Sequence, residues 1–318
     1  MKTRISFFTG KIGMMLISGT LMLCACPYVP NIPDDPTPPA EPVITSGRVN
    51  TLNKFSFRYG RMDVSAKLPQ TANGLWPAVW MMGDDVETVG WPECSEIDIV
   101  EMGSRDGINE GTQDRFLTRG AHWGPLLLGN GHPNYMLNDA YPKSLQDDFH
   151  LYTLVWDERV LQIYIDPELD ANLNLKPGNT PCYEMLINVY DGDYPVGKYF
   201  HKPDFIIMNL AVGGNFPQIH DINQITALHA GNNYEATMYV DFVRVFRHTK
   251  TNTSSPEEGL VWQDLFDGDR VDENKWNIEE NDDGGGNNEL QSYRRANVSV
   301  GKEPTSGKSC LILKAKKE

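Results

Sequence analysis

The chain has 318 residues, and its 28 Lys and Arg against 43 Asp and Glu give a formal net charge of −15 at pH 7. A surface this acidic repels phosphate and sulfate groups, which argues against nucleic acids and other polyanions as partners. A neutral polymer suffers no such repulsion. The length suits one large β domain with appendages, or two small domains.

The N-terminal part has the features of a bacterial export signal. Three basic residues precede a short apolar run at 12–17, and small residues follow it. Residues 23–26, Leu-Cys-Ala-Cys, resemble a lipobox in which Cys26 receives the lipid. A transmembrane helix is the alternative, but the apolar run is short for a span. We therefore expect residues 1–26 to direct a lipoprotein to the bacterial outer membrane, on its periplasmic face or at the cell surface.

A proline-rich segment separates this signal from the rest of the chain. Residues 27–43 contain seven prolines, a composition that forms an extended, semi-rigid tether. We expect residues 44–318 to form a single folded domain, monomeric and attached to the membrane lipid through Cys26.

From residue 44 onward the sequence predicts an all-β domain. Long helical periodicity is missing, and short alternating or β-branched runs are separated by Gly, Pro, Asn and Asp. Many short strands of this kind form a sandwich or barrel of antiparallel sheets. The segments 104–148 and 167–200 are predicted to be loops that shape a binding cleft. The clearest predicted strands are 59–68, 96–101, 150–156, 160–166, 205–212, 237–246, 298–301 and 310–315.

Residues 96–101, Glu-Ile-Asp-Ile-Val-Glu, place three carboxylates within one predicted strand. Strand side chains alternate between faces, so Glu96 and Asp98 share one side while the isoleucines enter the core. Glu101 has the wrong parity to join them unless a β-bulge adds one residue, and bulges are frequent beside active sites. Carboxylates held this close repel each other unless one keeps a proton, which is the arrangement that acid–base chemistry uses. An edge strand with outward polar residues and a calcium site are the alternatives.

Four tryptophans fit a sugar-binding role: Trp76, Trp80, Trp91 and Trp123. Indole faces stack on the C–H faces of sugar rings while polar neighbours bind the hydroxyl groups. Trp76 and Trp80 share strand parity, and the other two lie in loop-like segments. Core packing is the alternative, and we expect it for Trp156, Trp262 and Trp276, which lie inside or beside apolar strands.

Four segments together resemble glycoside hydrolase family 16, and most of all its laminarinase-like branch, which acts on β-1,3-glucans. These segments are 74–82, 96–103, 122–124 and 209–217. The resemblance implies a concanavalin A-like jelly-roll sandwich of two antiparallel sheets, in which the concave sheet forms an open cleft. It also implies that Glu96 is the nucleophile, Asp98 its electrostatic helper and Glu101 the general acid/base.

The chemistry of the residues supports the same assignment. Two glutamates on one face of a bulged strand lie closer than two acids that hold a water between them, and retaining glycosidases keep their carboxyls about 5–5.5 Å apart. We therefore expect a retaining endo-glycosidase that needs no catalytic cofactor and hydrolyses β-1,3-glucan or mixed-linkage β-1,3/1,4-glucan. A non-catalytic surface glycan-binding lipoprotein on the same fold is the alternative function.

The order of the family's segments is changed in this chain. Pieces that open the domain in the family occur here in residues 260–318, and a polar stretch at 250–259 joins them to the usual last strand. Domain termini often lie close together, so a short linker can connect the old ends. We infer a circular permutation in which 44–249 is the usual later part. A complete domain followed by the stump of a second copy is the alternative.

Three further residues are candidates for substrate contact, each with a structural alternative. Asn288 resembles a sugar-binding asparagine of the family or caps a turn, and Arg61 binds hydroxyl groups or forms an ion pair within the sheet. His122 contacts the leaving-group side or serves as a structural hydrogen-bonding group. The resemblance also implies a possible structural calcium, held by Asp241 and backbone carbonyl oxygens. Leu265 stands where the family commonly has Glu, which weakens that site.

Overall fold

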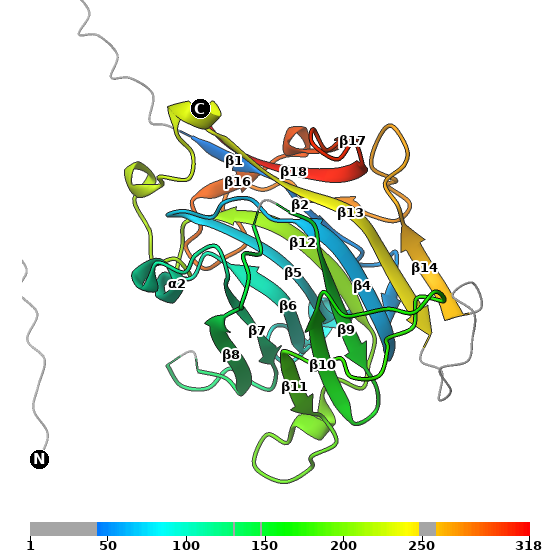
Figure 1. Cartoon of the computed structure of the whole chain (residues 1–318). Helices are drawn as coiled ribbons and strands as arrows, with labels where there is room; N and C mark the ends of the chain where they lie inside the picture. Colours follow the sequence, from blue (N-terminus) through cyan, green and yellow to red (C-terminus); the bar gives the residue numbers. More distant parts are fainter. Residues whose placement is uncertain (1–42, 130, 147, 248–258) are drawn as a thin grey trace, which may run out of the picture. The chain divides into compact units, whose positions relative to one another are not determined.

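The computed structural model describes residues 43–129, 131–146, 148–247 and 259–318. Cys26, residues 27–42 of the tether and residues 250–258 of the linker lie outside these described residues. Two β-sheets carry most of the regular structure and enclose a shared core (Figure 1). The predicted all-β two-sheet sandwich is therefore confirmed.

The first sheet has ten strands, eight of them in one continuous path. In order, the path consists of β11 (Tyr183–Leu186), β10 (Val160–Ile165), β9 (His150–Trp156), β4 (Gly60–Lys67), β13 (Glu235–Arg247), β18 (Ser309–Lys317), β1 (Ile44–Ser46) and β16 (Gln291–Tyr293). Beside this path, β14 (Leu260–Asp264) pairs with β13 and β17 (Val298–Lys302) pairs with β18. Neighbours are antiparallel except β1 and β16, which run parallel.

The second sheet has eight strands and is antiparallel throughout. Its path consists of β15 (Asn277–Ile278), β2 (Arg48–Asn50), β12 (Asp204–Val212), β5 (Leu75–Gly83), β6 (Glu96–Met102), β7 (Phe116–His122) and β8 (Asn134–Ala140), and β3 (Ser56–Phe57) pairs with β12. Strand β6, which carries the three carboxylates, lies between β5 and β7. Side chains from three adjacent strands therefore meet around them.

Apolar residues from both sheets fill the core. Val64 on β4 and Val79 on β5 are both fully buried, because each strand turns alternate side chains toward the opposite sheet. Trp156 and Trp276 are also fully buried, and Trp262 packs against the same cluster. These three tryptophans have the core positions that the sequence predicts.

All eight predicted strands are present, and each ends within two residues of its predicted limits. The two segments predicted to be loops, however, contain regular structure: 104–148 includes α2 (Arg105–Glu110), β7 and β8, and 167–200 includes β11. Strand β8 lies at the sheet edge and is mostly exposed, so it lacks the apolar alternation that marks a half-buried strand. The other helical pieces are α1 (Val86–Val89) and the 3-10 turns η1 (Val196–Lys198), η2 (Ile222–Gln224), η3 (Ala230–Asn232) and η4 (Arg295–Asn297). Across the described ranges, no helix is long and apolar enough to span a membrane.

Strands from the two ends of the described chain lie side by side (Figure 1, blue and red). β18 separates β13 from β1, and β15 pairs with β2 in the other sheet. The backbones of Val43 and Glu318 exchange two hydrogen bonds, of 3.0 and 2.8 Å. Residues 260–318 are therefore built into both sheets.

Candidate active site

A β-bulge in β6 brings the three carboxylates onto one face of the strand. Toward β5, the register passes from Asp98 to Val100 and skips Ile99. The pairing with β7 shifts over the same stretch, between Asp98 and Glu101. Ile99 and Val100 both enter the core, which reverses the parity of the strand beyond them. The expected bulge is present, and Glu101 joins Glu96 and Asp98 on the opposite face.

Each glutamate accepts a hydrogen bond from a tryptophan. Nε1 of Trp91 donates to Oε2 of Glu96, and Nε1 of Trp76 donates to Oε1 of Glu101, both at 2.9 Å. Such a bond stabilises the ionised form of a carboxyl group and fixes the direction of its side chain. The two indoles therefore orient the two acids.

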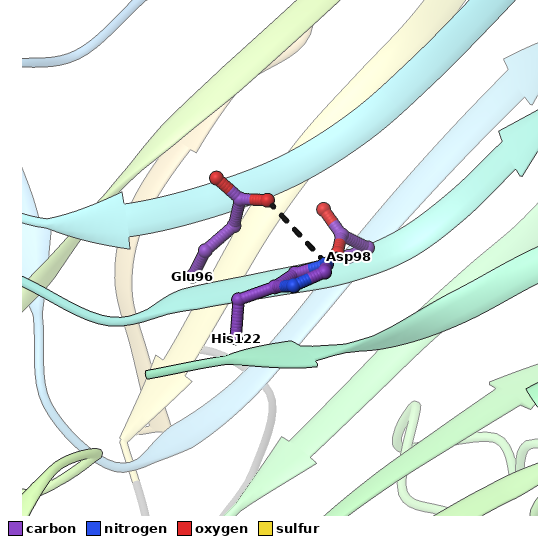
Figure 2. A group of neighbouring side chains, drawn as sticks. All are labelled: Glu96, Asp98 and His122. Atoms are coloured by element: carbon purple, nitrogen blue, oxygen red, sulfur yellow. Dashed lines mark ion pairs between the residues drawn. The ribbon is translucent and has the colours of Figure 1, made fainter. Parts of the chain in front are cut away.

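His122, at the end of β7, completes the cluster (Figure 2). Its Nε2 lies 3.3 Å from Oδ2 of Asp98 and 3.8 Å from Oε1 of Glu96. Its Nδ1 lies 2.7 Å from Nε2 of His132, which belongs to the loop between β7 and β8. The imidazole of His122 thus bridges two carboxylates and a second histidine.

The same cluster has the composition of a possible metal site. The ligand-type atoms of Glu96, Asp98 and His122 lie within 4.8 Å of one another, close enough to hold an ion. An imidazole nitrogen does not suit calcium, which takes oxygen ligands. A ring N–H that faces two carboxylates also balances their charge without an ion. The donor set therefore fits an acid–base site better than the calcium site considered from the sequence.

Burial raises the pKa of all three carboxyl groups. It raises the pKa of Asp98 to about 7, and together with the charge of Asp98 it raises the pKa of Glu101 to about 8. The pKa of Glu96 is raised well above its usual value, first by burial and then by the charge of Asp98, while His122 opposes the increase. Three such groups cannot all be ionised at neutral pH, so the cluster holds at least one proton.

The carboxylates lie where two hollows of one cleft meet. The hollows have volumes of about 410 and 440 Å³. Residues that line both hollows are Trp76, Trp91, Glu96, Glu101 and Asn287. Residues that line one of them include Arg48, Trp80 and Glu289 in the first and His122, His132 and Phe216 in the second. A polymer lying along this cleft would place sugar units on both sides of the acids.

Four residues predicted to bind substrate line the cleft: Trp76, Trp80, Trp91 and His122. Nε1 of Trp80 donates to Oδ1 of Asn209 at 2.7 Å, and the guanidinium of Arg48 lies 5.1 Å from the centre of the indole ring. Trp91 is 38% exposed, which leaves ring surface free for a sugar to stack on.

Trp123 and Arg61, by contrast, lie away from the cleft lining. Nε1 of Trp123 donates to the carbonyl oxygen of Tyr194 at 3.0 Å, so this indole anchors one loop to another. Arg61 belongs to β4 in the first sheet and forms an ion pair with Asp63 at 3.0 Å. For Arg61 the structure therefore has the ion pair within the sheet and not the substrate contact.

Asn288 and Asp241 have partners of their own as well. Asn288 has a left-handed backbone, with φ of 54°, and donates to Asn215 at 3.0 Å, while its neighbour Asn287 lines the cleft. The carboxylate of Asp241 forms an ion pair with the ammonium of Lys308. The structural calcium expected at Asp241 and backbone carbonyl oxygens stays a prediction.

Several residues of the cleft lining were not predicted from the sequence, among them Arg48, Asn209, Asn287 and His132. The guanidinium of Arg48 lies 5.1 Å from the ring of Trp80 and 5.8 Å from that of Tyr293. These contacts join segments that are distant in sequence, so no local pattern reveals them. His132 reaches His122 through the pairing of β7 with β8, a strand that was not predicted.

Comparisons with known proteins identify the family. The sequence profile described as glycosyl hydrolases family 16 matches residues 38–184. A Bacteroides ovatus GH16 protein of a mixed linkage glucan PUL, solved with a G4G4G3G product, is 36% identical, and the match covers 64% of this chain and 79% of that one with a TM-score of 0.53. A family 16 endo-glucanase from Bacteroides ovatus is 34% identical, with the same coverage of both chains and a TM-score of 0.52.

The matches to two longer relatives cover a smaller part of each relative than the 79% found for the solved structures. Glucan endo-1,3-beta-glucosidase A1 of Niallia circulans is 33% identical over 218 residues, which are 68% of this chain and 28% of that protein. A beta-1,3-glucan-binding protein of Penaeus monodon is 34% identical over 180 residues, 54% of this chain and 47% of that protein. The chain thus spans less than half of each of these two relatives. The solved structures identify the sandwich as the expected concanavalin A-like jelly roll, and the chain belongs to glycoside hydrolase family 16.

Proposed function

We propose that this protein is a retaining endo-glucanase that hydrolyses β-1,3-glucan or mixed-linkage β-1,3/1,4-glucan. One observation carries the proposal: the bulge in β6 sets Glu96 and Glu101 on one face of a single strand, with Asp98 between them. Retaining enzymes keep the two carboxyls about 5–5.5 Å apart, whereas inverting enzymes need about 6.5–9.5 Å to admit a water. Two glutamates on the same strand favour the shorter spacing.

The reaction proceeds in two displacements. Glu96 attacks the anomeric carbon while Glu101 protonates the leaving oxygen, and water then hydrolyses the glycosyl-enzyme with Glu101 as the base. The two displacements each invert the anomeric carbon, so its configuration is retained.

The imidazole of His122 lies beside Glu96, which supports this division of the roles. Burial raises the pKa of Glu96 well above its usual value, and the N–H of Trp91 and the imidazole of His122, 3.8 Å away, oppose that increase. At Glu101 the N–H of Trp76 and the charge of His122 likewise oppose the effect of burial, and its pKa is raised to about 8. Glu101 is therefore suited to hold the proton at neutral pH.

The lining of the cleft supports a neutral glucan as substrate. Trp76, Trp80 and Trp91 offer ring surface for sugar stacking, and hollows on both sides of the acids suit cleavage within a chain. The Bacteroides ovatus relative was solved with a mixed-linkage product, and the Niallia circulans relative is named for β-1,3 linkages. We therefore keep both linkages in the proposal.

A non-catalytic glucan-binding protein is the second candidate, because the Penaeus monodon relative carries that name. Binding requires the aromatic rings but not a bulged pair of glutamates with matched hydrogen-bond donors. Release of reducing ends from laminarin, lichenan and cellulose distinguishes the two. We expect turnover of laminarin or lichenan, and loss of about a thousandfold or more in Glu96→Gln with oligosaccharide binding kept. A wild-type protein that binds laminarin and lichenan without cleaving either would establish the second candidate.

We further propose that the domain is circularly permuted, with 44–249 as the usual later part, 250–259 as the joining linker and 260–318 as the usual opening strands. The position of β18 between β13 and β1 supports this order. The paired backbones of Val43 and Glu318 support it too, since a tight turn would connect them if the chain were uncut there.

We also propose a location for the protein from its N-terminal sequence. Residues 1–26 act as a lipoprotein signal, Cys26 receives the lipid, and 27–43 tether a monomeric enzyme to the outer membrane. The basic, apolar and small residues of the signal support it. Labelled palmitate is expected to enter the wild-type protein but not Cys26→Ala, which should leave the membrane fraction. A wild-type protein without label would refute the anchor.

A further inference from the structure

The loop after β7 returns a second histidine to the active site. Strands β7 and β8 stay paired as far as His122, and the next backbone N–H, that of Trp123, donates to the carbonyl oxygen of Pro133 at 3.0 Å. These contacts close the base of the loop and set His132 beside His122. The indole of Trp123 fixes the same base through Tyr194.

His132 contacts both of the groups that hold Glu96. Its Nε2 lies 2.7 Å from Nδ1 of His122, and its ring meets the ring of Trp91 edge-on with 4.7 Å between centroids. Trp91 in turn donates to Glu96, and His122 faces Glu96 and Asp98. We propose that His132 is a positioning residue for the nucleophile, an inference that rests on the proposed function. It acts through Trp91 and His122 and not by touching the reacting atoms.

The protonation states of the two rings explain how His132 acts. To stabilise ionised Glu96 and Asp98, His122 has to present an N–H from Nε2. When the His122 ring is neutral and carries its proton on Nε2, its Nδ1 is a hydrogen-bond acceptor. Nε2 of His132 then has to carry a proton and donate it to that Nδ1. If His122 carries a proton on both ring nitrogens, its Nδ1–H donates a hydrogen bond and Nε2 of His132 accepts that bond. In both states, the Nε2–H of His122 faces the carboxylates.

The alternative tautomer would disturb the nucleophile. A neutral His122 with its proton on Nδ1 would turn a lone pair toward Glu96 and Asp98, which are 3.8 and 3.3 Å away. That lone pair repels ionised carboxylates and favours their protonated forms. Which ring nitrogen carries the proton is set by the hydrogen bond that the other nitrogen makes, and at His122 the partner in that bond is His132.

Nitrogen-15 NMR of histidine-labelled protein tests this directly, without substrate. We expect His122 to carry a proton on Nε2, with its signals assigned by their loss in His122→Asn. In His132→Phe, the His122 signals should change toward a mixture of tautomers. A wild-type spectrum in which His122 is protonated on Nδ1 alone would overturn the proposal. This readout needs no turnover, so its failure is distinct from a failure of the proposed function.

Two matched substitutions separate the ring contact from the hydrogen bond. His132→Phe keeps an aromatic ring against Trp91 but removes the nitrogen, whereas His132→Gln keeps an N–H donor. We expect His132→Phe to lower kcat about 10- to 100-fold with little change in KM, as loss of groups that orient active-site ligands does, and His132→Gln to recover much of it. His229→Gln, at the N-cap of η3 and outside the cleft lining, serves as the control with unchanged kcat. A folded His132→Phe with wild-type kcat would contradict the role of His132.

Discussion

The indole N–H of Trp76 donates to Glu101 at 2.9 Å, and this hydrogen bond opposes the burial that raises the pKa of the same carboxyl group to about 8. A residue that must give up and regain a proton in each turnover works best with a pKa near the working pH. Trp76 also stacks on Phe216, with 4.7 Å between ring centroids, so the position of the donor is fixed. The side chain of Trp76 thus orients Glu101 and limits the increase in its pKa.

Trp76→Phe should raise the pKa of Glu101 further, because the lost hydrogen bond favours the ionised form. The basic limb of the profile of kcat/KM against pH, which reports loss of the acid's proton, should move up by on the order of one pH unit. Trp80→Phe is the matched control, since its indole donates to Asn209 and not to a carboxylate. A basic limb that stays in place in Trp76→Phe would mean that another group sets it.

The raised pKa of Glu101 also predicts how stability depends on pH. The folded state binds this proton more tightly than the unfolded state, so the free energy of unfolding falls as the pH rises from about 4.5 to about 8. Glu101→Gln cannot ionise and should gain stability relative to wild type over this range, by about 1–3 kcal/mol at pH 8. Thermal unfolding at pH 5 and pH 8 measures the difference. An equal effect at both pH values, or the same trend in the exposed control Glu158→Gln, would contradict this account.

A reordered chain tests the circular permutation. Placing 260–318 before 43–247 and joining Glu318 to Val43 through an Asn-Gly turn restores the usual order, and the hydrogen-bonded ends favour that turn. We expect this protein to fold and to turn over glucan like the wild type. Deleting 256–318 should instead abolish folding, because β13 and β1 lose β18 between them. A soluble, fully active deletion variant would defeat the permutation.

Arg61→Met should affect stability and not catalysis. Asp63 is 3% exposed, and loss of its partner at 3.0 Å leaves a buried carboxylate with a hydrogen bond from Thr153 and more distant charges to stabilise it. We expect the free energy of unfolding to drop by about 3–5 kcal/mol and kcat/KM of the folded enzyme to stay unchanged. Adding Asp63→Asn should restore part of the loss. If Arg61→Met had a higher KM and the stability of the wild type, Arg61 would be a substrate-binding residue after all.

The sequence was most informative where one local rule decides the structure. The parity of residues 96–101 required a bulge to bring Glu101 beside Glu96, and the register of β6 contains that bulge. The eight predicted strands follow from alternation of the same kind. Strand β8 was not predicted, because an exposed edge strand has no buried face and therefore no apolar alternation in its sequence.

Long-range contacts account for the site residues that the sequence did not place. Arg48 becomes part of the cleft only when the C-terminal segment folds beside it and Tyr293 covers its guanidinium. Trp123 looked like a sugar-binding residue, yet a carbonyl oxygen of a distant loop holds its indole. Asn288 and Asn287 are adjacent and chemically alike, so only the backbone of the turn decides which of them lines the cleft.

The central claim is double displacement by Glu96 and Glu101. Proton NMR of the first products from laminarin or lichenan, recorded before the anomers equilibrate, tests it most directly. Retention predicts that the β-anomer appears first and that the α-anomer grows in later by mutarotation. If the α-anomer appeared first, a water would have to act between the acids, and the assignment of Glu96 as nucleophile would be wrong.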